Sequence, residues 1–236
     1  MENSIKISII TICYNSSKTI EQTILSVLGQ TYQNYEYIVI DGGSTDGTVD
    51  ILHKYSRKIN WISEPDRGIY DAMNKGIRLS KGEWLNFMNA GDRFASNDVL
   101  EKIFSYEYPE DIKFLYSDTY FENKNFQRTF APHDHNIMRI NHQSSIYKKE
   151  LHYEHGFYVV TPKIIISDLL FFLQVPKECF RKVNTIISIN ETDGVSSGVW
   201  CLEQAVCAKV VFRQYSFTQM LLHYVSARIK RLLHII

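Results

Sequence analysis

Acidic and amide side chains occur in this chain where short apolar runs end. Asp41 closes one such run, Asp66 follows the next, and Asn89 and Asp92 follow a third. Carboxylates avoid burial unless they are paired or bind a cation, so repeated placement at this kind of position is hard to explain by folding alone. We expect these side chains to share one ligand-binding site.

The elements that must position them follow from the hydrophobic pattern. Short β-branched runs predict strands at 6–13, 35–41, 59–63 and 84–88, and helical spacing between them predicts helices at 19–30, 48–57 and 69–80. Ile7, Ile9, Ile10 and Ile12 are almost continuous, as in strands buried on both faces. The pattern predicts an α/β fold, a Rossmann-like mixed sheet with helices on both faces, whose ligand site lies at the carboxyl ends of the strands.

The second half continues the mixed α/β pattern. We expect a helix at 97–105, a strand at 112–118, a hairpin turn at Asn123 and Asn125, and a polar loop at 131–141. A strand at 143–147, a helix at 164–175, a strand at 183–189 and a helix at 200–215 complete the predicted elements.

Composition narrows the functional classes. The chain has 236 residues, with 26 Lys plus Arg balancing 26 Asp plus Glu, so no overall field attracts nucleic acid and no nucleic-acid partner is predicted. Its four cysteines fit neither a zinc site nor a disulfide framework, which favours reduced thiols and a cytoplasmic location. The first residues lack the features of an export signal, and no apolar run is long enough to span a bilayer as a helix.

The last 20 residues have apolar side chains at helical spacing, which predicts an amphipathic C-terminal helix at 216–236. Arg228, Lys230 and Arg231 add local positive charge, a pattern typical of a helix on an anionic membrane surface. This predicts peripheral association with the inner face of the cell membrane. Packing on the domain or on a dimer partner is the alternative.

Three stretches resemble the family 2 glycosyltransferases of the GT-A fold, in particular those of bacterial capsule, O-antigen and colanic-acid assembly. They read TICYNSSKTIEQTILSVLGQTYQNYEYIVIDGGSTDGT, SEPDRGIYDAMNKGI and GEWLNFMNAGD and cover about the first hundred residues; HQSSIYKK, the Asp168 segment and TDGVSS are similar more weakly. The resemblance implies a glycosyltransferase domain at 1–215, with a nucleotide-sugar half at 1–92 and an acceptor half at 93–215. It implies an inverting transfer from a nucleotide-sugar donor, UDP favoured over GDP, to a saccharide acceptor that is lipid-linked.

The same resemblance implies roles for residues along the first half. It places the base and ribose on Thr11, Tyr14 and Asn15, and a hydrogen bond from the base on Asp41. It lines the donor pocket with Asp66, Gly68, Asp71, Asn74 and Asn89. For Asp41 and Asp66 the alternative is a structural role in a turn or helix cap, and for Asp46 that role is favoured.

The metal motif of the family reads Asn89-Ala90-Gly91-Asp92 here, so one carboxylate remains. The resemblance implies that Asp92 binds Mg²⁺ or Mn²⁺, which neutralises the leaving diphosphate. His142 is the candidate second ligand, with a purely structural role as the alternative. Asp168, the only carboxylate in the apolar stretch 164–175, matches the family's general base.

Two other functions compete with this interpretation. A nucleotidyltransferase would require a Gly-rich basic loop after the first strand, where this chain has YNSSKT. A catalytically weak sugar-nucleotide-binding partner of another transferase is suggested by Gly91, but Asp92 and Asp168 argue against it.

Overall fold

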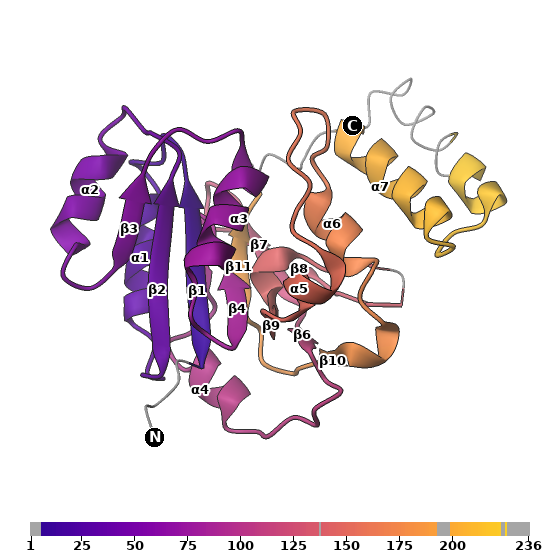
Figure 1. Cartoon of the computed structure of the whole chain (residues 1–236), viewed down its shortest axis with the longest axis horizontal. Coiled ribbons are helices and arrows are strands. Elements are labelled where there is room, and N and C mark those ends of the chain that lie inside the picture. The colour runs from indigo at the N-terminus through magenta and orange to yellow at the C-terminus, as the bar shows by residue number, and fades with distance from the viewer. Residues whose placement is uncertain (1–5, 137, 193–198, 223–224, 226–236) are drawn as a thin grey trace.

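The computed structural model describes residues 6–136, 138–192, 199–222 and 225, and its main feature is a seven-stranded sheet in the order β10-β6-β9-β4-β1-β2-β3 (Figure 1). Its strands are β1 (Ile7–Cys13), β2 (Tyr35–Asp41), β3 (Asn60–Ser63), β4 (Trp84–Phe87), β6 (Phe114–Tyr116), β9 (Ser145–Lys148) and β10 (Phe180–Lys182). The first four strands confirm the predicted ones to within one residue at each end.

Parallel pairing brings the polar strand ends together. β1 pairs in parallel with β2 and with β4, and β2 pairs in parallel with β3, so the four carboxyl ends share one edge of the sheet. This is the upper edge in Figure 1. β9 runs antiparallel between β4 and β6, which makes the sheet mixed.

Helices cover both faces of the sheet, as predicted. On one face, α1 (Ile20–Leu28), α2 (Thr48–Tyr55) and α4 (Val99–Phe104) pack over Ile7 and Ile9. On the other face, α3 (Ile69–Leu79), α5 (Leu151–His155) and α6 (Ser167–Phe172) pack over Ile10 and Ile12. Ile7 and Ile9 therefore enter one core and Ile10 and Ile12 the other, which explains why the strand is apolar on both faces.

A smaller four-stranded sheet, in the order β5-β11-β7-β8, lies beside the large one. It consists of β5 (Arg93–Phe94), β7 (Thr119–Glu122), β8 (Arg128–Ala131) and β11 (Ser188–Glu191). β7 and β8 form the predicted hairpin, whose turn is held by the Asn123 side-chain carbonyl accepting from the Asn125 and Gln127 amides. β11 runs antiparallel to β5, and β5 begins directly after Asp92, the last residue of the loop that follows β4.

Several predicted elements of the second half were wrong in extent. Only the last two residues of the strand predicted at 183–189 are a strand, the start of β11, because residues 183–187 cross from β10 in the large sheet to β11 in the small one. The crossing is held at both ends by backbone donors: the Val183 amide donates to the Tyr116 carbonyl, and the amide of the buried Ile187 donates to Ser117 Oγ. The strand predicted at 143–147 begins as a 3₁₀ turn, His142–Ser144, and the helix predicted at 164–175 is confined to α6.

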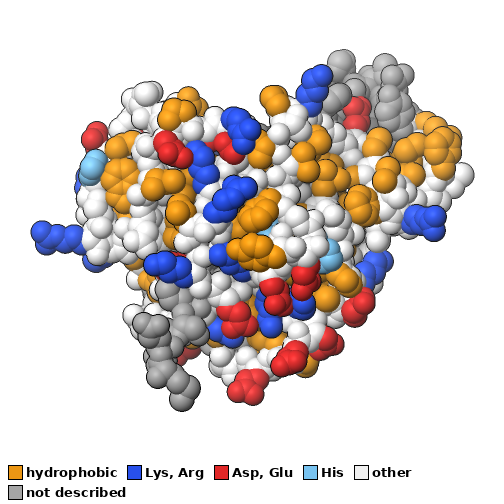
Figure 2. All heavy atoms as spheres, in the orientation of Figure 1, with side chains coloured by type: hydrophobic (Ala, Val, Ile, Leu, Met, Phe, Trp, Pro, Cys, Tyr) orange, Lys and Arg blue, Asp and Glu red, His pale blue; other side chains and the backbone are white. Residues whose placement is uncertain are grey.

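The C-terminal part contains α7 (Val199–Val211) and a further helical stretch at 217–222. Most of the predicted amphipathic helix at 216–236 lies outside the described residues. Apolar side chains gather on this end of the molecule (Figure 2), where Val211, Phe217, Leu221 and Leu222 are all exposed. Within the described ranges, no helix combines the length and the apolar character needed to cross a bilayer.

Candidate active site at the strand ends

Asp41, at the end of β2, holds the loop that follows it. Its Oδ2 accepts from the Gly43 amide (3.1 Å), the Ser44 amide (2.9 Å) and Ser63 Oγ (2.6 Å), and its Oδ1 accepts from Ser44 Oγ and the Cys13 thiol. A carboxylate has about four lone-pair positions, so these donors saturate it. Burial raises the pKa of the Asp41 carboxyl, but the bonds from Ser44 and Ser63 outweigh burial and hold the pKa below its ordinary value.

Thr11 and Asn15 also use their side chains in hydrogen bonds within the chain. Thr11 is fully buried, and its Oγ1 donates to the Met88 carbonyl at 2.7 Å. Asn15 Oδ1 accepts from the Thr45 amide at 2.9 Å, which ties the β1 and β2 loops together. Asp46 has the predicted structural role, because its carboxylate accepts from the Thr48 amide at the start of α2 and from the Ser17 amide.

Tyr14 and Asp66 meet over Gly42, on the outer side of these loops. A Cβ at Gly42 would lie 2.6 Å from Asp66 Oδ2 and 3.3 Å from Tyr14 Cδ2, so both side chains contact the position that glycine leaves open. Tyr14 is 64% exposed. Asp66 Oδ1 accepts from the Gly68 amide at 2.8 Å, whereas Oδ2 has no hydrogen bond to the described residues. An exposed aromatic face and an available carboxylate oxygen therefore lie side by side.

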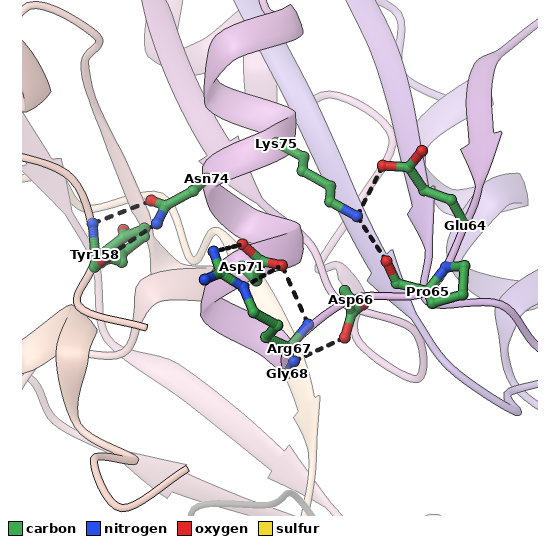
Figure 3. A network of polar contacts seen from close by, with 9 residues as sticks. All are labelled: Glu64, Pro65, Asp66, Arg67, Gly68, Asp71, Asn74, Lys75 and Tyr158. Atoms are coloured by element: carbon green, nitrogen blue, oxygen red, sulfur yellow. Dashed lines mark hydrogen bonds and ion pairs between the residues drawn. The ribbon is translucent and has the colours of Figure 1, made fainter. Parts of the chain in front are cut away.

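The start of α3 is fixed by a network of polar contacts (Figure 3). Asp71 pairs with the Arg67 guanidinium at 2.9 Å, and this bond is the main reason that the pKa of Asp71 is lowered. Asn74 binds the backbone of Tyr158 with both amide atoms, donating to its carbonyl (2.8 Å) and accepting from its N–H (3.0 Å). Asp71 orients Arg67, and Asn74 joins α3 to the segment before α6.

Asp168 lies at the first turn of α6 and accepts three hydrogen bonds. His142 Nδ1 is 2.9 Å from Oδ2, and Oδ1 accepts from Tyr70 Oη (2.8 Å) and the Leu169 amide (2.9 Å). One of its roughly four acceptor positions remains, on Oδ2. Burial raises the pKa of Asp168, but the hydrogen bonds from His142, Tyr70 and the Leu169 amide outweigh burial, so the pKa lies below its ordinary value and the group is ionised at neutral pH.

His142 bridges Asp168 and the end of β4. Its Nε2 lies 2.8 Å from Asn89 Nδ2. With the amide nitrogen facing the ring, Nε2 is the acceptor, so the neutral imidazole carries its proton on Nδ1 and donates it to Asp168. Both ring nitrogens are thus engaged, and this geometry favours a positioning role over the metal-ligand role predicted for His142.

Asp92 is 6% exposed and also accepts from two segments. Its Oδ2 accepts from Gln143 Nε2 (2.7 Å) and its Oδ1 from the Glu191 amide (3.0 Å). Burial raises the pKa of Asp92 to about 6 in spite of these bonds, and the Glu191 charge adds to the increase. His142 and Gln143 are neighbours in the chain, so one turn connects Asp168 to Asp92.

The oxygen groups near Asp92 fit a hard divalent cation. Within the described part of the chain, no three His, Cys, Asp or Glu side chains form a complete protein cage. Asp92 has a second carboxylate beside it, that of Glu191 at Gly91, and Asn89 Oδ1 is buried without a partner among the described residues. Oxygen donors suit Mg²⁺ and Mn²⁺, which commonly complete their shells with water and substrate phosphates.

The structure thus brings together Asn89, Asp92, His142 and Asp168, and separately Tyr14, Asp66 and Gly68. It shows the predicted donor residues Thr11, Asp41 and Asn74 with engaged, buried side chains, so their direct contact with a donor stays a prediction. Sequence reasoning did not identify Tyr70, Gln143 or Glu191 as site residues. Gln143 could have been found from its position next to His142, whereas Glu191 is 99 residues from Asp92 and has no local signal.

A mixed α/β sheet with acidic side chains at its carboxyl edge is the architecture of the GT-A transferases, the class that the comparisons with known proteins also support. The sequence model of glycosyl transferase family 2 matches residues 8–169, and the chain belongs to this family. It is 42% identical over 102 residues to an uncharacterized glycosyltransferase of Mycobacterium tuberculosis, a match that covers 42% of this chain and 39% of that protein. The chain therefore matches well under half of that relative.

Two further relatives have more specific names. A PGL/p-HBAD biosynthesis glycosyltransferase of Mycobacterium bovis is 28% identical over 206 residues, covering 81% of this chain and 79% of that protein. The UDP-Glc:alpha-D-GlcNAc-diphosphoundecaprenol beta-1,3-glucosyltransferase WfaP of Escherichia coli is 36% identical over 118 residues, covering 49% of this chain and 47% of that protein.

Solved structures share the fold. The S. aureus TarS 1-349 complex with UDP-GlcNAc has a TM-score of 0.69 at 18% identity, over 88% of this chain and 65% of that one. The mannosyltransferase PcManGT of Pyrobaculum calidifontis, in complex with GDP-Man and Mn²⁺, has a TM-score of 0.68 at 15% identity, over 87% and 64%. At these identities the likeness concerns the fold alone.

Proposed function

We propose that this chain is an inverting glycosyltransferase that moves one sugar from a nucleotide donor to the hydroxyl of a lipid-linked saccharide. The observation that carries the proposal is the turn at His142 and Gln143, which ties the Asp168 carboxylate to the Asp92 carboxylate. One group suited to accept a proton and one suited to hold a cation are thereby fixed at the same strand edge.

Asp168 is the general base in this proposal. A sugar hydroxyl is a weak nucleophile until its proton is removed as the new bond forms, and a positioned carboxylate can accept that proton. The free acceptor position on Oδ2 is available for the hydroxyl, while His142 and Tyr70 hold the carboxylate in place. Attack from the face opposite the leaving diphosphate inverts the configuration at the anomeric carbon.

Asp92, at the end of β4, is the residue that would hold the divalent cation. When bound, Mg²⁺ or Mn²⁺ supplies charge neutralisation for the departing diphosphate. The mannosyltransferase PcManGT was solved with Mn²⁺, which supports a metal in this fold. Gln143 fixes the Asp92 carboxylate by donating to Oδ2 at 2.7 Å, and leaves each oxygen a further lone pair.

In this proposal the nucleobase of the donor binds at Tyr14 and Asp66. The exposed Tyr14 ring offers a face for stacking, and Asp66 Oδ2 beside it can accept from an N–H of the base. A uracil has one such imide N–H, and both WfaP and the TarS complex carry UDP-sugars in their names. A UDP-sugar is therefore the donor we propose in preference to a GDP-sugar. The lipid-linked acceptor rests on the name of WfaP alone.

The chain would act at the cytoplasmic face of the membrane, where a lipid-linked acceptor is presented. The exposed Phe217, Leu221 and Leu222 beside α7 support a peripheral contact with that surface.

The test is a panel of UDP- and GDP-sugars, assayed for binding and for sugar transfer with and without Mn²⁺. Asp92→Ala should weaken metal-dependent donor binding, and Asp168→Ala should retain donor binding but lose turnover. Asp50→Ala, on the exposed side of α2, is the matched control and should behave as wild type. Normal sugar transfer by Asp168→Ala would refute the assignment of the base.

A further inference from the structure

Gly91 is a position where a second carboxylate approaches the metal motif. Its φ is +102°, a conformation that favours glycine. A Cβ built there would lie 2.6 Å from Glu191 Oε2 and 2.9 Å from Glu191 Cδ, far inside van der Waals contact. The absence of a side chain at Gly91 is therefore what allows the Glu191 carboxylate to lie against this turn.

The strand register fixes Glu191 at this place. In the antiparallel pair of β11 and β5, Ser188 is opposite Phe94 and Ile189 is opposite Arg93. Continuing this register by two residues brings Glu191 opposite Gly91. The Glu191 amide also donates to Asp92 Oδ1 at 3.0 Å, so backbone pairing, rather than a flexible side chain, holds the two acidic residues together.

Among the described side chains, no Lys or Arg forms an ion pair with either carboxylate at this place. The Glu191 carboxylate has no hydrogen bond or ion pair with any described residue, although its backbone is tied to Asp92. The nearest partners of Asp92 are neutral: the Gln143 amide and the Glu191 backbone N–H. Two carboxylates held side by side repel each other, and a bound cation removes that repulsion.

We propose that Glu191 supplies the second protein oxygen to the divalent cation bound by Asp92, replacing from β11 the acid that the Asn89–Asp92 segment lacks. The inference rests on the proposed function, because it assigns a ligand to the metal of that site. It predicts a metal centre built from the large sheet and the small sheet together, with Gly91 required for their approach.

Metal binding by the full chain tests the proposal directly. Free Mn²⁺ is followed by its electron paramagnetic resonance signal during titration, with and without UDP. Glu191→Gln keeps the size of the side chain and the backbone bond to Asp92 but removes the charge. We expect its Mn²⁺ affinity to fall by at least about tenfold, the loss that even an outer-shell partner of a ligand typically causes. Asp92→Asn should show at least as large a loss.

Controls separate this inference from the proposed function. Glu107→Gln removes a charge from an exposed glutamate elsewhere and should bind Mn²⁺ as wild type does. UDP binding without metal should be the same in Glu191→Gln and wild type, and circular dichroism should show both folded. Wild-type Mn²⁺ affinity in Glu191→Gln would overturn the proposal, as would a wild-type chain that binds no Mn²⁺. Sugar transfer by wild type in EDTA would reject the metal centre while leaving the transferase function intact.

Discussion

Replacing His142 by alanine tests whether the imidazole acts through Asp168. The change removes the 2.9 Å bond from Nδ1 to the Asp168 carboxylate but leaves those from Tyr70 and Leu169. A hydrogen bond to a charged group contributes about 1.5–3 kcal/mol, which corresponds to about a 10- to 100-fold fall in kcat when the bond positions a base. The KM for the donor should hardly change, because Gln143 and Asp92 are untouched.

The pH profile gives a second readout with a defined sign. His142 is the largest influence that lowers the pKa of Asp168 against burial, so the variant should raise that pKa. The acid limb of kcat should therefore move to higher pH, since the base must lose its proton to work. A merely structural role for His142 would lower activity without moving this limb.

A double-mutant cycle completes the test. Asp168→Asn alone should reduce kcat by about 10²- to 10⁴-fold. Adding His142→Ala to it should cost little more, because the histidine acts through a base that is already absent. Fully additive losses, or an unchanged kcat and acid limb in His142→Ala, would refute the reasoning.

Three further predictions concern stability and the membrane. Burial lowers the pKa of His152 from 6.5 to about 4, so the unfolded state takes up the proton first as the pH falls. The free energy of unfolding should therefore decrease between pH 6.5 and about 4, by about 3 kcal/mol in all. His152→Gln should flatten this part of the pH dependence in urea titrations. Asn74→Ala leaves the buried N–H and carbonyl of Tyr158 without their partner and should cost about 2–4 kcal/mol in the same assay, whereas exposed Asn60→Ala should stay within about 0.5 kcal/mol. Deleting residues 217–236 should reduce sedimentation with anionic liposomes, and unchanged sedimentation would contradict the membrane contact.

The sequence predicts the first half of the fold well because its signals are local. Each strand from β1 to β4 is a short apolar run closed by polar residues, and each helix between them has its own period. In the second half, Val183, Ile186 and Ile187 read as one strand although the chain changes sheets there. The apolar pattern alone does not distinguish a paired strand from a segment that crosses between two sheets, and of these three residues only Ile187 is fully buried.

The sequence predicts the edge of the sheet at which the site lies and the acidic residues in it, but it does not predict the hydrogen bonds that these residues make. Asp92 could be selected because it matches the metal motif of the resembled family, and Asp168 because it is the only carboxylate in the apolar stretch 164–175. The engagement of Asp41 by its own loop depends on how Gly43, Ser44 and Ser63 fold around it, and the approach of Glu191 depends on the register of β11. The bonds of Asp41 to Gly43 and Ser44 are local and match the turn role named as its alternative, whereas the bond to Ser63 and the approach of Glu191 join distant segments and leave no trace in local spacing.

The saturated carboxylate of Asp41 affects how mutagenesis of this protein must be interpreted. Asp41→Ala would remove the acceptor of the Gly43 amide, the Ser44 amide and Ser63 Oγ at once, so the loop after β2 and the end of β3 would both lose an anchor in a single variant. Weaker nucleotide affinity in that variant would then report the loss of order in this loop. It would give no information on a bond between Asp41 and the base. Ser63→Ala removes only one donor to Asp41, so its nucleotide affinity measures how much the order of this loop contributes to binding.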